Sequence, residues 1–121
     1  MNEIYQKYLK ENPGSGNLRI RAYAANGAVP ISNLKVVVSK DIDNQKIIFF
    51  EGKTDESGII DKIKLPAPII DTDNLIKPNS TTYDITATYN NIDLLYIINM
   101  YDNVCVVQNI SVVPDIGLGE I

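Results

Sequence analysis

The segment at residues 54–58 constrains the fold more than any other part of the chain. It reads Thr-Asp-Glu-Ser-Gly and runs directly into an alternation of apolar and polar residues at 59–65, which Pro66 and Pro68 close. Asp, Ser and Gly supply the dihedral angles of a tight turn, the alternation is typical of a half-buried strand, and proline stops a strand from continuing. The segment therefore predicts a hairpin in a β-sheet protein.

Similar strand patterns recur along the chain. Apolar runs and alternations separated by turn residues occupy residues 18–23, 34–39, 46–51, 83–88, 92–100 and 104–113. With the strand at 59–65 they make about seven short strands, which is typical of an immunoglobulin-like or prealbumin-like sandwich. We therefore expect an all-β fold with a β-sandwich domain at residues 16–114, a long loop at 66–81, a turn at 26–27 and a flexible tail at 115–121.

A short helix is expected before the sandwich, with residues 1–15 forming helix and linker. Four apolar or aromatic residues share one face at helical spacing, namely Ile4, Tyr5, Tyr8 and Leu9. Glycines at positions 14 and 16 end the segment and would act as a hinge. Two alternatives remain for the apolar face: it docks on a partner protein, or it folds back over an open end of its own sandwich.

The residue inventory argues against catalysis. The chain of 121 residues contains no histidine and a single cysteine, Cys105. Histidine is the commonest general base and zinc ligand, and one thiol can form neither an internal disulfide nor a thiolate metal site. We therefore predict that the protein is not an enzyme and holds no cofactor, and that Cys105 is a small packed residue of the last strand.

Charge and hydropathy exclude two classes of partner. With 15 acidic against 11 basic residues the net charge is −4, which disfavours binding to the phosphate backbone of nucleic acids. The longest apolar stretch, at residues 94–100, is too short to cross a bilayer. The first residues show no signal peptide, so synthesis in the cytoplasm is expected. We predict no nucleic-acid partner and no membrane partner.

Two loop segments place carboxylates at alternating positions, as hard cations such as calcium require. The candidates are Asp41 and Asp43 in one segment and Asp71 and Asp73 in the other, and an asparagine follows each pair. Both segments lack the ordered glycine and the distal glutamate of an EF-hand. Because Asp and Asn form turns without any ion, we predict no metal site and keep calcium as the alternative.

The order of three motifs resembles a known family. The motifs are Gly-Asn-Leu-Arg-Ile-Arg-Ala at 16–22, Ala-Val-Pro-Ile-Ser-Asn-Leu-Lys-Val at 28–36, and the turn at 54–58. In this order they resemble carboxypeptidase regulatory-like domains of the prealbumin-like sandwich class. The segments at 65–68 and 108–114 are further similar to the non-catalytic N-terminal module of clostridial spore cortex-lytic enzymes. The resemblance implies a non-catalytic module that binds or assembles in a spore or cell-envelope setting, with a protein or peptidoglycan as partner.

A surface adhesin or pilin-like module is the competing hypothesis. The turn at 54–58 is also similar to that of adhesin and pilin repeats that close a Lys–Asn isopeptide bond. The first strand carries Arg19 and Arg21 where that chemistry needs lysine, and a protonated guanidinium is a poor nucleophile. Under either hypothesis the function lies on the surface, so we expect protein binding or self-association through the N-terminal helix or a sheet edge.

Overall fold

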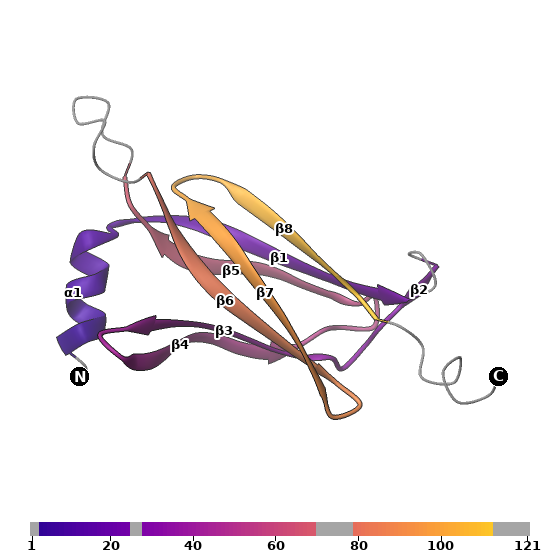
Figure 1. The fold of residues 1–121 in the computed structure, drawn as a ribbon. Coiled ribbons are helices and arrows are strands. Elements are labelled where there is room, and N and C mark those ends of the chain that lie inside the picture. Colours follow the sequence, from indigo (N-terminus) through magenta and orange to yellow (C-terminus); the bar gives the residue numbers. More distant parts are fainter. Residues whose placement is uncertain (1–2, 25–27, 70–78, 113–121) are drawn as a thin grey trace.

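The computed structural model describes residues 3–24, 28–69 and 79–112, and within them the chain is built mainly of strands (Figure 1). Helix α1 (Glu3–Glu11) comes first. The strands that follow are β1 (Gly14–Ala24), β2 (Val29–Pro30), β3 (Lys35–Ile42), β4 (Gln45–Lys53), β5 (Ile59–Ala67), β6 (Ser80–Tyr89), β7 (Ile92–Tyr101) and β8 (Cys105–Ser111). They pack as two layers, which confirms the predicted all-β sandwich with a short N-terminal helix. The described strands exceed the expected seven because β2 is a two-residue pairing with the end of β1.

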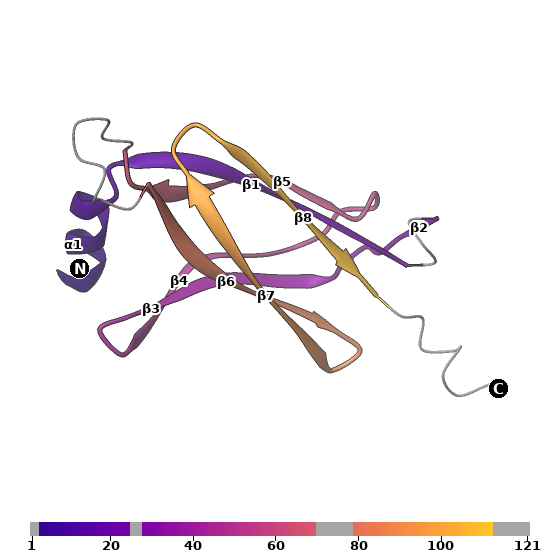
Figure 2. The same cartoon turned by 45° about the horizontal axis from the view of Figure 1, so that its top comes forward.

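Each layer is a four-stranded sheet (Figure 2). In sheet A, β1 lies between β5 and β8, and β2 pairs with its last two residues. In sheet B the order is β4, β3, β6, β7. Neighbouring strands are antiparallel except β1 and β8, which run parallel. Among the described strands, β5, β8 and the short β2 therefore lie at the edges of sheet A, and β4 and β7 form the edges of sheet B.

The core lies between the sheets and follows the two-residue period of the strands. In β1, Leu18, Ile20 and Ala22 are buried, whereas Arg19 and Arg21 alternate with them on the outer face. Successive side chains of a strand point to opposite faces, so each strand contributes one row to the core. The largest fully buried side chains of the other strands are Val36 and Val38 in β3, Leu65 in β5, Tyr83 and Ile85 in β6, Met100 in β7, and Ile110 in β8.

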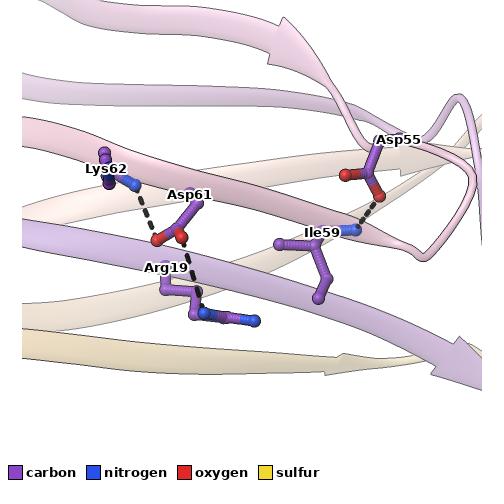
Figure 3. Close-up of polar contacts among 5 residues, drawn as sticks. All are labelled: Arg19, Asp55, Ile59, Asp61 and Lys62. Carbon is purple, nitrogen blue, oxygen red and sulfur yellow. Dashed lines mark hydrogen bonds and ion pairs between the residues drawn. The ribbon is translucent and has the colours of Figure 1, made fainter.

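The turn at residues 54–58 has the local structure that its sequence predicts. Asp55 Oδ1 accepts backbone hydrogen bonds from Ser57 and Ile59, both at 2.9 Å, and the bond from Ile59 is drawn in Figure 3. Gly58 has a φ of 75°, which favours glycine. The predicted hairpin is nevertheless wrong, because β4 pairs with β3 in sheet B while β5 pairs with β1 in sheet A. Turn residues specify a change of direction, but they do not specify the strand with which the next segment pairs.

The start of β1 corrects the predicted linker and hinge. Gly14 and Gly16 lie within β1, where they pair with Ala67 and Leu65 of β5. A Cβ atom added at Gly16 would collide with the carbonyl oxygen of Tyr101. The glycines therefore permit a close approach of backbones, and the predicted boundary at residue 16 falls inside a paired strand.

The predicted loop at residues 66–81 is shorter in the structure. β5 continues through Pro66 to Ala67, and β6 begins at Ser80. Pro66 is tolerated because β5 is an edge strand, in which a missing backbone donor need not interrupt a ladder. Residues 70–78 of the predicted loop, the predicted turn at 26–27 and the predicted tail at 115–121 lie outside the described residues.

Candidate binding surface

Helix α1 lies across one end of the sandwich (Figure 1). Tyr8 has only 6% of its surface exposed. Its ring meets Phe49 at 5.6 Å and Tyr83 at 6.4 Å between centroids, both edge-on, and Tyr5 contacts Phe49 at 5.6 Å. The helix therefore folds back over its own sandwich. Of the two alternatives for the apolar face, folding back holds for Tyr8, and this candidate partner-binding residue is not accessible to a partner because its side chain is already packed in the core.

A chain of hydroxyl groups joins this helix to both sheets. The Tyr8 hydroxyl donates to the Tyr83 hydroxyl at 3.1 Å and shares a hydrogen bond of 2.7 Å with Thr81 Oγ1. The Tyr83 hydroxyl donates in turn to the carbonyl oxygen of Pro66 at 2.6 Å. Burial raises the pKa of both tyrosines, and the contact with Tyr8 raises the pKa of Tyr83 further. Both hydroxyls therefore remain protonated near neutral pH and serve as structural hydrogen-bonding groups.

A cavity of about 350 Å³ remains beside the helix. Tyr5 and Leu9 of α1 line it together with Lys64 and Pro66 of β5. Tyr5, Leu9 and Ile4 are each half-buried, so only part of the predicted partner-binding face is accessible here. Partner binding through these three residues stays a prediction.

The calcium candidates are only partly within the described residues. Asp43 and Asn44 form the turn between β3 and β4, with φ angles of 51° and 64° that Asp and Asn adopt more readily than other side chains. Asp41 lies in β3 opposite Lys46 of β4. Turn formation thus accounts for Asp43, whereas Asp41 is a paired residue of β3. Asp71 and Asp73 lie outside the described residues, and calcium binding there stays a prediction.

Cys105 is exposed, which corrects the prediction that it packs in the core. Ile110 and Val112 are buried, so the even-numbered residues of this segment form the inner row. Cys105 therefore falls in the outer row, opposite Asn17 of β1. Both neighbours of Cys105 are valines, and the polar residues Gln108 and Asn109 of the same strand fall in opposite rows, so the sequence did not assign the two rows.

The outer face of sheet A is charged. Arg19 Nη1 lies 3.5 Å from Asp61 Oδ2 (Figure 3), and Arg21 and Lys64 are exposed on the same sheet. Asp61 and Lys62 together stand opposite Arg19, which makes a β-bulge in β5. An ion pair this exposed contributes less than about 1 kcal/mol. The charges therefore serve solubility more than stability.

The outer face of sheet B is different, because it exposes apolar side chains at its β7 edge. Leu95 and Ile97 have 75% and 72% of their surface exposed, the highest values among the exposed large apolar residues of the described chain. By register they lie beside Thr86 and Asp84 of β6. A shallow groove of about 290 Å³, lined also by Ser39, adjoins them. We call Leu95 and Ile97 the β7 patch.

The β7 patch was missed at the level of sequence, although a signal for it exists. Residues 94–98 read Leu-Leu-Tyr-Ile-Ile and are apolar or aromatic at every position. A strand of an antiparallel sheet with one wet face should alternate instead. An uninterrupted apolar run in such a fold therefore indicates a strand whose outer row is also suited to burial.

Comparison of the chain with protein families finds no family that matches, and comparison with curated proteins finds no match either. The likeness to carboxypeptidase regulatory-like domains therefore stays a prediction. Within residues 3–24, 28–69 and 79–112, no helix is long and apolar enough to cross a membrane. The same ranges contain no group of three or more His, Cys, Asp or Glu that could hold a metal ion.

Proposed function

We propose that the protein is a non-catalytic binding or assembly module and that the β7 patch is its contact surface. The observation that carries the proposal is the exposure of Leu95 and Ile97, at 75% and 72%, in one row of one strand. Burying a leucine or isoleucine side chain contributes about 1.5–3 kcal/mol, so a partner that covers this row gains substantial free energy. Adjacent apolar side chains that are this exposed are typical of interaction sites.

The position of the patch on an edge strand supports the same function. No described strand pairs with the outer edge of β7, so its backbone N–H and C=O groups are available to a partner. A partner strand can therefore make main-chain hydrogen bonds along β7 while its side chains cover Leu95 and Ile97. The two kinds of contact reinforce each other, since exclusion of water by the apolar row strengthens the neighbouring hydrogen bonds.

The biological setting is proposed from the motif resemblance alone. The order of the segments at 16–22, 28–36 and 54–58 is similar to regulatory-like modules, and this favours a spore or cell-envelope context. A protein partner fits the apolar β7 patch better than peptidoglycan does, because a polar glycan would leave both side chains in contact with water. Co-sedimentation with purified peptidoglycan should therefore leave the protein in the supernatant. Saturable sedimentation that survives the double substitution of Leu95 and Ile97 by threonine would favour the glycan.

A photo-crosslinking amino acid at position 97 tests the contact surface in the native cell. The matched control carries it at Asn109, which is exposed on β8 at the outer face of sheet A. We expect a discrete adduct from position 97 and little or none from position 109. Equal adducts from both positions, or none from position 97 in a chain that unfolds at the normal temperature, would contradict the proposed surface.

A further inference from the structure

We infer that the partner of the β7 patch is a second copy of this chain, paired antiparallel along the free edge of β7. The inference rests on the proposed function and names the partner for the same surface. Pairing at this edge joins the two four-stranded B sheets into one continuous sheet. The partner strand is then another β7, so every contact away from the two-fold axis occurs twice.

The edges of the sandwich are not equally protected against such pairing. β4 carries Lys46, Glu51 and Lys53, and its register with β3 is irregular between Val38 and Ser39. Charged side chains and bulges are the usual means by which an edge strand avoids another strand. The other edge of sheet B is less protected: β7 is ten residues long, has a regular ladder to β6, and carries a single charge, Asp93.

The edges of sheet A fit a second strand less well than β7 does. β5 contains Pro66 and the bulge at Asp61 and Lys62, both of which interrupt a regular ladder. β8 is uncharged but has only seven residues, and its most exposed apolar residue is Val107 at 50%. β7 is therefore the described edge that is at once long, regular, almost uncharged and apolar at the centre of its outer row.

Self-complementarity selects one register. In a pair of antiparallel β7 strands, the outward-pointing side chains of one strand stand opposite those of the other only when the two-fold axis passes through a residue of β7. Three positions of the axis bring the two β7 patches together, namely at Leu95, Tyr96 and Ile97. Centred on Leu95, the pairing places Ile97 opposite the partner's Asp93, and centred on Ile97 it places Leu95 opposite the partner's Asn99. Centred on Tyr96, it places Leu95 opposite the partner's Ile97, and this contact occurs twice. We therefore assign the register centred on Tyr96, in which opposed Cβ atoms lie about 4.5–5.5 Å apart.

The remaining contacts in this register are free of like-charge repulsion. Asp93 faces the partner's Asn99, and its carboxylate already accepts a hydrogen bond of 2.8 Å from Thr88 Oγ1. Ile92 faces the partner's Met100, so residues 92–100 of each chain are paired along a strip about 30 Å long. A strip of one strand's width lies at the lower end of specific interfaces, so the dimer is weak and concentration-dependent. Each chain carries a net charge of −4, so added salt should strengthen the association.

Sedimentation velocity of the purified full chain, from about 10 µM to about 1 mM, tests the inference. The test variant combines Leu95→Thr with Ile97→Thr, which keeps strand-forming side chains and removes the apolar contact. The matched control is Ile48→Thr, because Ile48 is 53% exposed on β4, the opposite edge of sheet B. We expect a reversible dimer, a dissociation constant at least about tenfold higher in the double variant, and an unchanged constant in the control.

Disulfide trapping tests the register. Leu95→Cys and Ile97→Cys are placed in separate chains, each with Cys105→Ser, and oxidised alone and as a mixture. We expect a crosslinked dimer that forms fastest in the mixture, because Leu95 faces the partner's Ile97. Equal or faster crosslinking of either chain alone would overturn the register. A strictly monomeric wild-type chain at about 1 mM, combined with a foreign protein captured at position 97, would overturn the second copy and leave the proposed function standing. A wild-type chain that stays monomeric and gives no adduct at position 97 would contradict both the second copy as partner and the proposed function.

Discussion

Replacing Tyr8 by alanine tests whether α1 is an integral part of the sandwich. Tyr8 is 6% exposed and packs edge-on against Phe49 and Tyr83. Removal of a buried aromatic side chain costs about 3–5 kcal/mol, which includes the cavity that is left. The two ring contacts, at about 0.5–1.5 kcal/mol each, and the hydroxyl hydrogen bonds form a large share of that cost.

The position of α1 at the start of the chain sets an upper limit on the stability that Tyr8→Ala can lose. α1 is the first element of the chain and can detach without unpairing a strand, so the loss cannot exceed the free energy with which the helix docks. We therefore expect the lower end of the range, a decrease of about 3 kcal/mol in the free energy of unfolding. With about 2.1 cal/mol/K of unfolding entropy per residue, a chain of 121 residues should lose about 12 °C in melting temperature.

Chemical and thermal unfolding, followed by circular dichroism, measure this difference. Lys7→Ala is the matched control, because Lys7 is exposed on the same helix and alanine is a good helix former. Its stability should stay within about 0.5 kcal/mol of the wild type. If Tyr8→Ala and Lys7→Ala unfold within that margin of each other, the helix does not contribute to the core and the reasoning fails.

The remaining predictions concern pH, backbone packing, thiol exposure and calcium. Above pH 10 the unfolded chain loses tyrosine protons that the native chain keeps, because burial raises the pKa of Tyr83 and its hydroxyl partner. The free energy of unfolding, fully retained below pH 10, should therefore fall by about 1.4 kcal/mol per pH unit through Tyr83 alone, and urea titrations of Tyr83→Phe should show a shallower slope. Gly16→Ala should lower the free energy of unfolding by more than about 2 kcal/mol, because its Cβ would meet backbone. Gly52→Ala, which meets only the tip of a phenylalanine ring, should cost less. Cys105 should react with a thiol reagent in the native protein, since its side chain is exposed. Millimolar calcium should leave the melting temperature unchanged.

Each of these expectations has a contradicting outcome. A flat stability profile between pH 10 and 11.5, or an unchanged slope in Tyr83→Phe, would show that the hydroxyls are not shielded from solvent. Equal losses in the free energy of unfolding for Gly16→Ala and Gly52→Ala would contradict the close backbone approach at Gly16. Protection of Cys105 until global unfolding would place it in the core after all. A saturable rise in melting temperature with calcium, abolished by Asp71→Ala, would establish a calcium site that includes Asp71.

Most of the architecture could be predicted from local pattern. The alternation of buried and exposed residues in β1 and β6, and the turn chemistry of Asp55 and Gly58, depend only on the two-residue period of a strand and on the dihedral preferences of each residue. Both are properties of a few consecutive residues. The sequence alone therefore determined an all-β chain, the approximate place of its strands, and the helix before them.

Tertiary structure decided which strands pair with each other and which row of side chains in each strand stays exposed. The turn after β4 leads into the other sheet, because β5 finds its partner in β1, more than thirty positions away from β5 along the chain. The helix face that could have met a partner is held by Phe49 of β4 and Tyr83 of β6. Cys105, Leu95 and Ile97 belong to strands with apolar residues in both rows, and only packing against the opposite sheet selects the row that is buried. Long-range pairing and burial are properties of the assembled layers, so no local pattern could assign them.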